Sequence, residues 1–191
     1  MSQRNAEELT AGLEEVARSP VGAGRLEMIV RRPGVDAREV LESAQLDLEL
    51  GLVGDTWRER GSRQTEDGSA DPDRQLTVMN ARAAALVAVD RTRWPLAGDQ
   101  LFVDLHLGAA ELPAGTLLTI GDTSVIEVTG PPHTGCAKFS ARFGIDALRV
   151  VNSETGRALN LRGINARVVI PGTIRVGDEI VAVPAEVVRA G

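Results

Sequence analysis

Short apolar runs separated by tight turns dominate the second half of this 191-residue chain. Val, Ile, Leu and Thr fill these runs, and such residues favour strands. Gly accepts a positive φ and Asp bonds its own neighbouring backbone, so the recurring Gly-Asp pairs are typical of turns. Many short strands with frequent turns predict a closed or nearly closed β-barrel rather than an alternating α/β sheet. The expected strands in this half cover residues 101–105, 116–120, 124–129, 166–170 and 179–183.

The first half of the chain is predicted to add short helices to this barrel. Apolar residues at helical spacing predict an amphipathic helix over residues 5–18. Asn80 is a suitable N-cap for a second helix over residues 81–89. The polar, Gly- and Ser-rich stretch 58–73 is predicted to be a mobile loop. The fold class is therefore mainly β, a β-barrel with a few short peripheral helices.

Strands are also expected before the second helix. Residues 25–31 and 75–79 are predicted strands, and residues 46–50 alternate Leu with acidic residues, as a half-buried strand does. With no repeat and no clear linker, a single domain is the simplest interpretation. The predicted division is an N-terminal helical extension over 1–24, one barrel domain over 25–183 and a C-terminal tail over 184–191.

Composition narrows the class of protein. The formal net charge is -6 and aromatic residues make up 3%, which disfavours nucleic-acid binding through a basic, base-stacking surface and disfavours anionic membranes. A single cysteine excludes an internal disulfide and indicates a reducing compartment. The N-terminal stretch has no apolar core, so no signal peptide is expected, and no apolar run has the length of a membrane span. We therefore expect a cytoplasmic protein.

The strongest candidate for chemistry is the only cysteine, Cys136, in the segment VTGPPHTGCAK. A strand is expected to end before a proline turn, and apolar residues at helical spacing follow the cysteine. A thiol at a helix start meets unpaired N–H groups and the positive end of the helix dipole, which favour the nucleophilic and metal-binding thiolate. Lys138, and His133 when protonated, would act in the same direction. The alternative is a small buried side chain, as most free cysteines are.

His133 precedes Cys136 by three residues, and the pair could share a metal or form a thiolate–imidazole couple. A closed zinc site takes four protein ligands, and the only other histidine, His106, lies in a different segment. A structural zinc is therefore not expected. The alternative for His133 is a turn residue that bonds a backbone carbonyl.

Lys138 and four further residues are candidates for ligand binding. Arg162 and Asn165 precede a strand and could place a guanidinium and an amide in a pocket, where an Arg fork suits phosphate or carboxylate. Arg74 could contact an anion at the start of a strand, and Asp55 follows a glycine turn. The alternatives are a surface Arg in a β-turn, a salt-bridged strand start and a plain turn aspartate.

In their order along residues 25–183, these segments resemble the MOSC domain, named for the C-terminal domain of molybdenum-cofactor sulfurases. The resemblance implies a β-barrel whose pocket cysteine carries sulfur as a persulfide or ligates molybdenum, a role that maps onto Cys136. It also implies pocket roles for Asp55 and Arg74. The matching segments are Gly51–Asp55, Asp73–Val78, Leu96–Leu101, Leu112–Gly115, Ile120-Gly121, Pro131–Cys136, Phe143-Gly144, Arg162–Ala166 and Gly172–Asp178.

The chain departs from the family pattern at two places. Many members have Arg-His where this chain has Thr56-Trp57, and Arg-Asn where it has Asp99-Gln100. Both changes remove positive charge or an anion donor near the expected pocket. They put tight binding of the phosphate-bearing molybdenum cofactor in question.

Three functions are therefore open. In the first, Cys136 accepts, carries or delivers sulfur, from a sulfur-donor protein as partner, or binds a molybdenum centre, while Arg162, Asn165 and Arg74 orient a small-molecule or cofactor ligand. The second is molybdenum-dependent reduction of N-hydroxylated small molecules. The third is a non-catalytic barrel that binds a ligand or partner. The chain has no aminotransferase-like domain, so it is not expected to make persulfide with pyridoxal phosphate by itself.

Overall fold

Seven strands close into a mixed β-barrel in the computed structural model, which describes residues 3–183. They run in the order β11, β7, β8, β9, β5, β6 and β1, and β1 pairs with β11 to close the ring. β5 and β6 are parallel and every other pair in the ring is antiparallel. This confirms the predicted fold class. The bounds are β1 Ala23–Arg31, β5 Leu76–Asn80, β6 Leu101–Asp104, β7 Leu117–Ile120, β8 Ser124–Val128, β9 Ile164–Ile170 and β11 Glu179–Val183.

Four shorter strands extend the barrel. β2 (Glu39–Leu41) pairs with the outer end of β1. β10 (Gly172–Arg175), β3 (Ser43–Asp47) and β4 (Gly51–Leu52) form a separate antiparallel sheet in that order. β10 follows β9 after a single residue, so the chain passes directly from the barrel into the small sheet. The sequence patterns did not predict β2 or β10.

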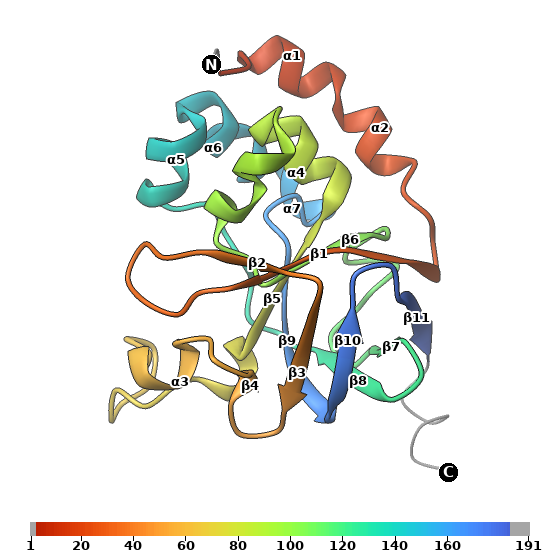
Figure 1. Ribbon diagram of the computed structural model, residues 1–191. Coiled ribbons are helices and arrows are strands. Elements are labelled where there is room, and N and C mark those ends of the chain that lie inside the picture. The colour runs from red at the N-terminus through yellow and green to blue at the C-terminus, as the bar shows by residue number, and fades with distance from the viewer. Residues whose placement is uncertain (1–2, 184–191) are drawn as a thin grey trace.

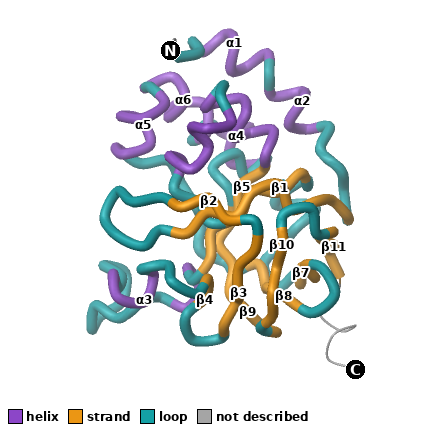
Figure 2. Tube along the Cα trace, viewed as in Figure 1, coloured by secondary structure: helices purple, strands orange, loops and turns teal. Residues whose placement is uncertain are grey.

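The helices gather mainly at one end of the barrel (Figure 1, and purple in Figure 2). The helices at this end are α1 (Ala6–Ala11), α2 (Leu13–Ala17), α4 (Ala81–Ala88), α5 (Ala137–Phe143) and α6 (Ile145–Val151). α3 lies at the opposite end, beside β4 (Figure 1). The remaining helical elements are α3 (Trp57–Arg60), α7 (Glu154–Ala158) and two 3₁₀ turns, η1 (Pro72–Arg74) and η2 (Arg91–Ala97).

The strands bury side chains on both faces, because helices cover part of the outside of the barrel. Along β6, Leu101 and Val103 point into the barrel core, and Phe102 between them joins the core under the helices. Val78 and Met79 of β5 divide in the same way. This two-residue alternation explains why the strand runs read as continuously apolar.

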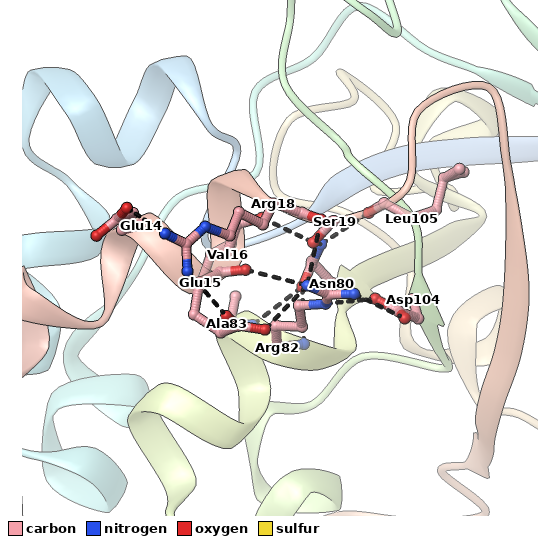
Figure 3. A network of polar contacts seen from close by, with 10 residues as sticks. All are labelled: Glu14, Glu15, Val16, Arg18, Ser19, Asn80, Arg82, Ala83, Asp104 and Leu105. Carbon is pink, nitrogen blue, oxygen red and sulfur yellow. Dashed lines mark hydrogen bonds and ion pairs between the residues drawn. The ribbon is translucent and has the colours of Figure 1, made fainter.

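A polar network fastens the N-terminal helices to the barrel (Figure 3). Asn80 ends β5 and caps α4, and its side-chain oxygen accepts from the backbone N–H groups of Arg82 and Ala83 at 2.7 and 3.0 Å. Its amide nitrogen donates to Ser19 Oγ at 2.8 Å. Arg82 bonds Asp104 of β6 and Glu15 of α2. The predicted cap at Asn80 is thus confirmed, and it also ties the segment before β1 in place.

The helix predicted over residues 5–18 is interrupted. α1 ends and α2 begins around Gly12, so the stretch forms two short helices. A Cβ at Gly12 would lie 2.3 Å from Cδ1 of Leu86, so α4 packs where a side chain would stand. Leu9 and Val16 are nevertheless buried, as the spacing predicted.

The strand predicted over residues 46–50 is wrong in its second half. β3 ends at Asp47, whose Oδ1 accepts from the backbone N–H groups of Glu49 and Leu50 at 2.8 and 2.9 Å. This turn leaves Leu48 54% exposed. Alternation of Leu with acidic residues therefore continued past the true strand end.

The stretch 58–73 contains ordered elements. It begins within α3 and ends within η1, and the backbone N–H of Ser62 bonds the carbonyl of Gly68 between them. The predicted tail 184–191 lies outside the described residues. Within residues 3–183, no helix has both the length and the apolar character needed to span a membrane.

Candidate functional site

The segment from Gly130 to Cys136 links β8 to α5 and carries the two residues predicted to do chemistry. Cys136 is the N-cap of α5, with an extended backbone, and its carbonyl accepts from the N–H of Ser140 at 3.0 Å. The helix therefore begins where the sequence predicted. Cys136 is free and exposed, which contradicts the alternative of a small buried side chain.

His133 turns inward from the same segment. Its side chain is 17% exposed, and Nδ1 lies 3.4 Å from Oδ1 of the fully buried Asp99. The contact lacks hydrogen-bond geometry, so both atoms are buried without a hydrogen-bond partner in the described chain. This arrangement differs from the alternative of a turn residue bonded to a backbone carbonyl. The side chain of His133 is thus largely buried, whereas Cys136 stays at the surface.

The pKa of His133 is lowered to about 4 from an ordinary value of 6.5, and burial is the largest cause. The positive charge of Arg162 is the second cause, and Arg32 and Arg74 contribute smaller effects in the same direction. The carboxylate of Asp99 acts in the opposite direction and is outweighed. His133 is therefore neutral at physiological pH, so it cannot stabilise a thiolate at Cys136 by its charge.

This pKa predicts an acid-sensitive fold. Between pH 6.5 and about 4 the unfolded chain binds a proton at residue 133 that the folded chain does not, so stability falls as the pH falls through this window. The loss contributed by His133 should reach about 3 kcal/mol and change no further below the folded pKa. Urea unfolding of wild type and His133→Gln from pH 4 to 7 measures it. The variant should lose this part of the pH dependence, and His106→Gln should keep it. Parallel curves for wild type and His133→Gln would contradict the assignment.

Asp99 organises the inner side of the site. The Arg162 guanidinium donates to Asp99 Oδ2 at 2.6 Å and to the carbonyl of Ala97 at 2.7 Å. The same guanidinium lies 5.1 Å from the ring centre of Phe139 in α5. Arg162 is buried, which contradicts the alternative of a surface Arg in a turn. Asp99 thus neutralises a buried arginine and contacts His133.

Asp55 is committed to a second buried ion pair. Its carboxylate accepts from Nε and Nη2 of Arg32 at 2.7 and 2.8 Å, and from the backbone N–H of Arg32 at 3.0 Å. Nη1 of Arg32 donates to the carbonyl of Gly98 at 3.0 Å. Arg32 and Arg162 therefore both hold the turn at residues 97–99. Both carboxylate oxygens of Asp55 are used within the protein, so no contact supports a ligand role. That role stays a prediction.

Arg74 and Asn165 hold the proline turn that leads to Cys136. Asn165 Nδ2 donates to the carbonyl of Pro131 at 2.9 Å. Arg74 pairs with Asp71 at 3.1 Å, the salt-bridged arrangement that the sequence left open. It also reaches the carbonyl of Pro132, at 3.5 Å. The fold thus brings Arg74, Asn165 and Arg162 close to the Cys136 segment, while Asp55 pairs with Arg32 instead. That these residues bind a ligand stays a prediction.

A cationic pocket of about 350 Å³ begins two residues beyond Cys136. We define it by its four basic side chains, Arg32, Arg38, Arg60 and Lys138; the acidic side chains of Asp36 and Glu59 also line it. Sequence reasoning found Lys138 and missed the three arginines, because they come from the loop after β1 and from α3. The loop after β1 and α3 meet the start of α5 only in the folded chain.

Two of these basic groups have no committed partner. Within residues 3–183, neither the Arg60 guanidinium nor the Lys138 ammonium forms an ion pair or a hydrogen bond. Desolvation and the neighbouring charge of Arg32 lower the pKa of Arg60. Desolvation and Arg142 lower the pKa of Arg38, which bonds the carbonyl of Pro95. Each of these cations disfavours the charged form of its neighbour. A bound anion would offset this repulsion.

Cys136 does not line the cationic pocket, although Lys138 does. No group of three or more His, Cys, Asp or Glu side chains within residues 3–183 is placed to hold a metal ion. A metal at Cys136 would therefore take its other ligands from a cofactor.

The architecture defines a class: a closed mixed β-barrel with an exposed cysteine between a proline turn and a short helix. A model of the MOSC domain matches residues 65–181, and the chain belongs to this family, whose domains are associated with the molybdenum cofactor. A search of curated proteins found no match.

Solved structures share the fold. The YuaD protein from Bacillus subtilis is 16% identical with a TM-score of 0.62, over 83% of this chain and 94% of that one. YiiM from Escherichia coli is 21% identical with a TM-score of 0.52, over 83% and 69%. YiiM from Geobacillus stearothermophilus is 13% identical with a TM-score of 0.51, over 86% and 74%.

Proposed function

We propose that this MOSC protein binds an anionic, molybdenum-bearing pterin in its cationic pocket and uses Cys136 to handle the sulfur or the metal of that ligand. One observation carries the proposal: the exposed thiol of Cys136 lies two residues from Lys138, which shares a pocket with Arg60 and two further arginines. The segment that carries the thiol thus also contributes one of the basic groups of this pocket, Lys138.

The donor set fits a phosphate-bearing cofactor. Arg60 and Lys138 are free to bind phosphate oxygens, and Arg38 adds charge at the same pocket. Arginine forks and lysine ammonium groups are the usual protein partners of phosphate. Cys136 would contribute a single sulfur ligand. Such a cofactor would supply a redox-active metal, for which residues 3–183 hold no cluster of His, Cys, Asp or Glu ligands.

The exposed position of Cys136 also suits transfer of sulfur from a donor protein. In such a step the Cys136 thiolate attacks the outer sulfur of a donor persulfide, RS–SH. A new S–S bond forms to Cys136, the donor S–S bond breaks and the donor leaves as the thiolate RS⁻. The products are Cys136–S–SH and RS⁻, so no external oxidant or reductant is needed.

Reversing the uncommitted charges tests the pocket. In the double variant Arg60→Glu/Lys138→Glu, purified from a host that makes the molybdenum cofactor, the molybdenum content per chain should fall at least about tenfold, because each lost contact weakens anion binding by roughly 1 kcal/mol or more. Mass-spectrometric metal analysis measures the ratio.

Arg25→Glu/Arg175→Glu is the matched control, because it makes the same change in net charge at two exposed arginines, on β1 and β10. It should keep the wild-type molybdenum content. Equal loss in both variants would mean that net charge alone controls binding. Wild-type protein without molybdenum would contradict the cofactor proposal.

A further inference from the structure

A second pocket, of about 350 Å³, lies beside the proline turn and contains His133 in its lining. We name it the acceptor pocket. Its walls include Leu112, Pro113, Val128 and Ile164, and among residues 3–183 no Asp, Glu, Lys or Arg lines it. It therefore differs in chemistry from the cationic pocket. Apolar walls with a few convergent polar groups are typical of small-molecule sites.

His133 lines this pocket and also a neighbouring cavity that Arg157 and Arg162 line. A neutral imidazole carries one N–H and one lone-pair nitrogen. Nδ1 is buried 3.4 Å from the Asp99 carboxylate, and Arg162 holds that carboxylate in place, so the proton belongs on Nδ1. Nε2 is then the acceptor. No donor in the described chain bonds it, and the side chain keeps 17% exposure.

Two asparagines add polar groups to the same lining. Asn165 donates its amide N–H to the carbonyl of Pro131 at 2.9 Å, and Asn160 donates to the carbonyl of Leu107 at 2.7 Å. In the described chain each amide keeps a second N–H and a carbonyl oxygen without a hydrogen bond, so each asparagine can both donate and accept. Among these side chains only His133 Nε2 is limited to accepting, so the lining matches an uncharged ligand that carries a donor group.

We propose that the acceptor pocket binds a small, uncharged, partly apolar molecule through an O–H or N–H group that donates to His133 Nε2. The apolar part of the molecule packs between Leu112 and Ile164. The proposal goes beyond the proposed function, because it concerns a different pocket and its test requires no cofactor. The two pockets border the same segment, with His133 in one lining and Lys138 in the other.

Phenol and its methyl ether, anisole, test the proposal as probes of nearly equal shape, since only phenol has a donor. Titration followed by NMR at the amide signals of Gly163 and Asn165 should show phenol binding about three- to tenfold more tightly than anisole, as one hydrogen bond would give. His133→Phe should bring the two affinities together. Lys138→Ala, in the cationic pocket, should leave their ratio unchanged.

A second measurement keeps the proposal testable where His133→Phe does not fold. The ¹⁵N shifts of the imidazole ring in wild type should show the proton on Nδ1 at pH 7, and phenol should move the Nε2 signal. His106→Gln identifies the His133 resonances. Equal affinities for phenol and anisole, a failure of both to bind, or a ring protonated on Nε2 would overturn the proposal.

Discussion

Asp55→Ala is expected to lower the free energy of unfolding by about 3–5 kcal/mol, because it leaves the Arg32 guanidinium buried without its partner. The Asp55 side chain is fully buried and both of its oxygens accept from Arg32. Asp55 also accepts from the backbone N–H of Trp57 at 3.0 Å, so the start of α3 loses a bond as well. Urea unfolding at pH 7 measures the change.

Two further variants separate the ion pair from charge in general. Asp122→Ala removes an exposed carboxylate from the β7–β8 turn and should change stability by no more than about 0.5 kcal/mol. Arg32→Met/Asp55→Leu removes both charges and should be less destabilised than Asp55→Ala. An Asp55→Ala protein as stable as the wild type would show that the pair is not structural, and would return Asp55 to the candidate ligand residues.

Cys136→Ala is expected to abolish both sulfur acceptance and molybdenum retention, reducing each to background. Cys136 is the only cysteine of the chain, so no other thiol can replace it. The side chain is exposed and makes no cap hydrogen bond, so the fold should tolerate its removal. Unfolding curves that match the wild type would confirm this, and metal content and intact mass measure the loss.

Cys136→Ala/Ser69→Cys moves the thiol to an exposed loop and serves as the matched control. It should fail to retain molybdenum and should accept sulfur from a persulfide donor more slowly than wild type. Equal behaviour of the moved thiol would mean that any exposed cysteine suffices, and the position of Cys136 beside the cationic pocket would then carry no function.

The barrel could be predicted because local sequence patterns mark most of its strands. Apolar runs of four or five residues between Gly-Asp turns mark β6, β7 and β8 closely, and the N-cap at Asn80 marks α4. The two errors, in the predicted strand 46–50 and the predicted helix 5–18, also have local causes. An Asx turn at Asp47 ended a strand that the alternation continued, and packing of Leu86 against Gly12 divided a helix whose spacing was otherwise correct.

The site was only partly predictable, because its decisive contacts join distant segments. The segment around Cys136 stands out from its proline turn and the helix that follows. The partners of the predicted charges do not: Arg32 reaches Asp55 across 23 residues, and Arg162 reaches Asp99 across 63. No local pattern identifies such pairs, and no local pattern shows that Arg38 and Arg60 meet Lys138.

Native mass spectrometry of freshly purified protein, from a host that makes the molybdenum cofactor, tests the central claim most directly. The expected wild-type spectrum contains either the mass of one extra sulfur, located on Cys136 by peptide analysis, or the mass of a bound molybdenum pterin. Cys136→Ala should show neither. A wild-type chain found only at its unmodified mass, with a free thiol and no bound cofactor, would contradict the proposal that Cys136 handles sulfur or molybdenum.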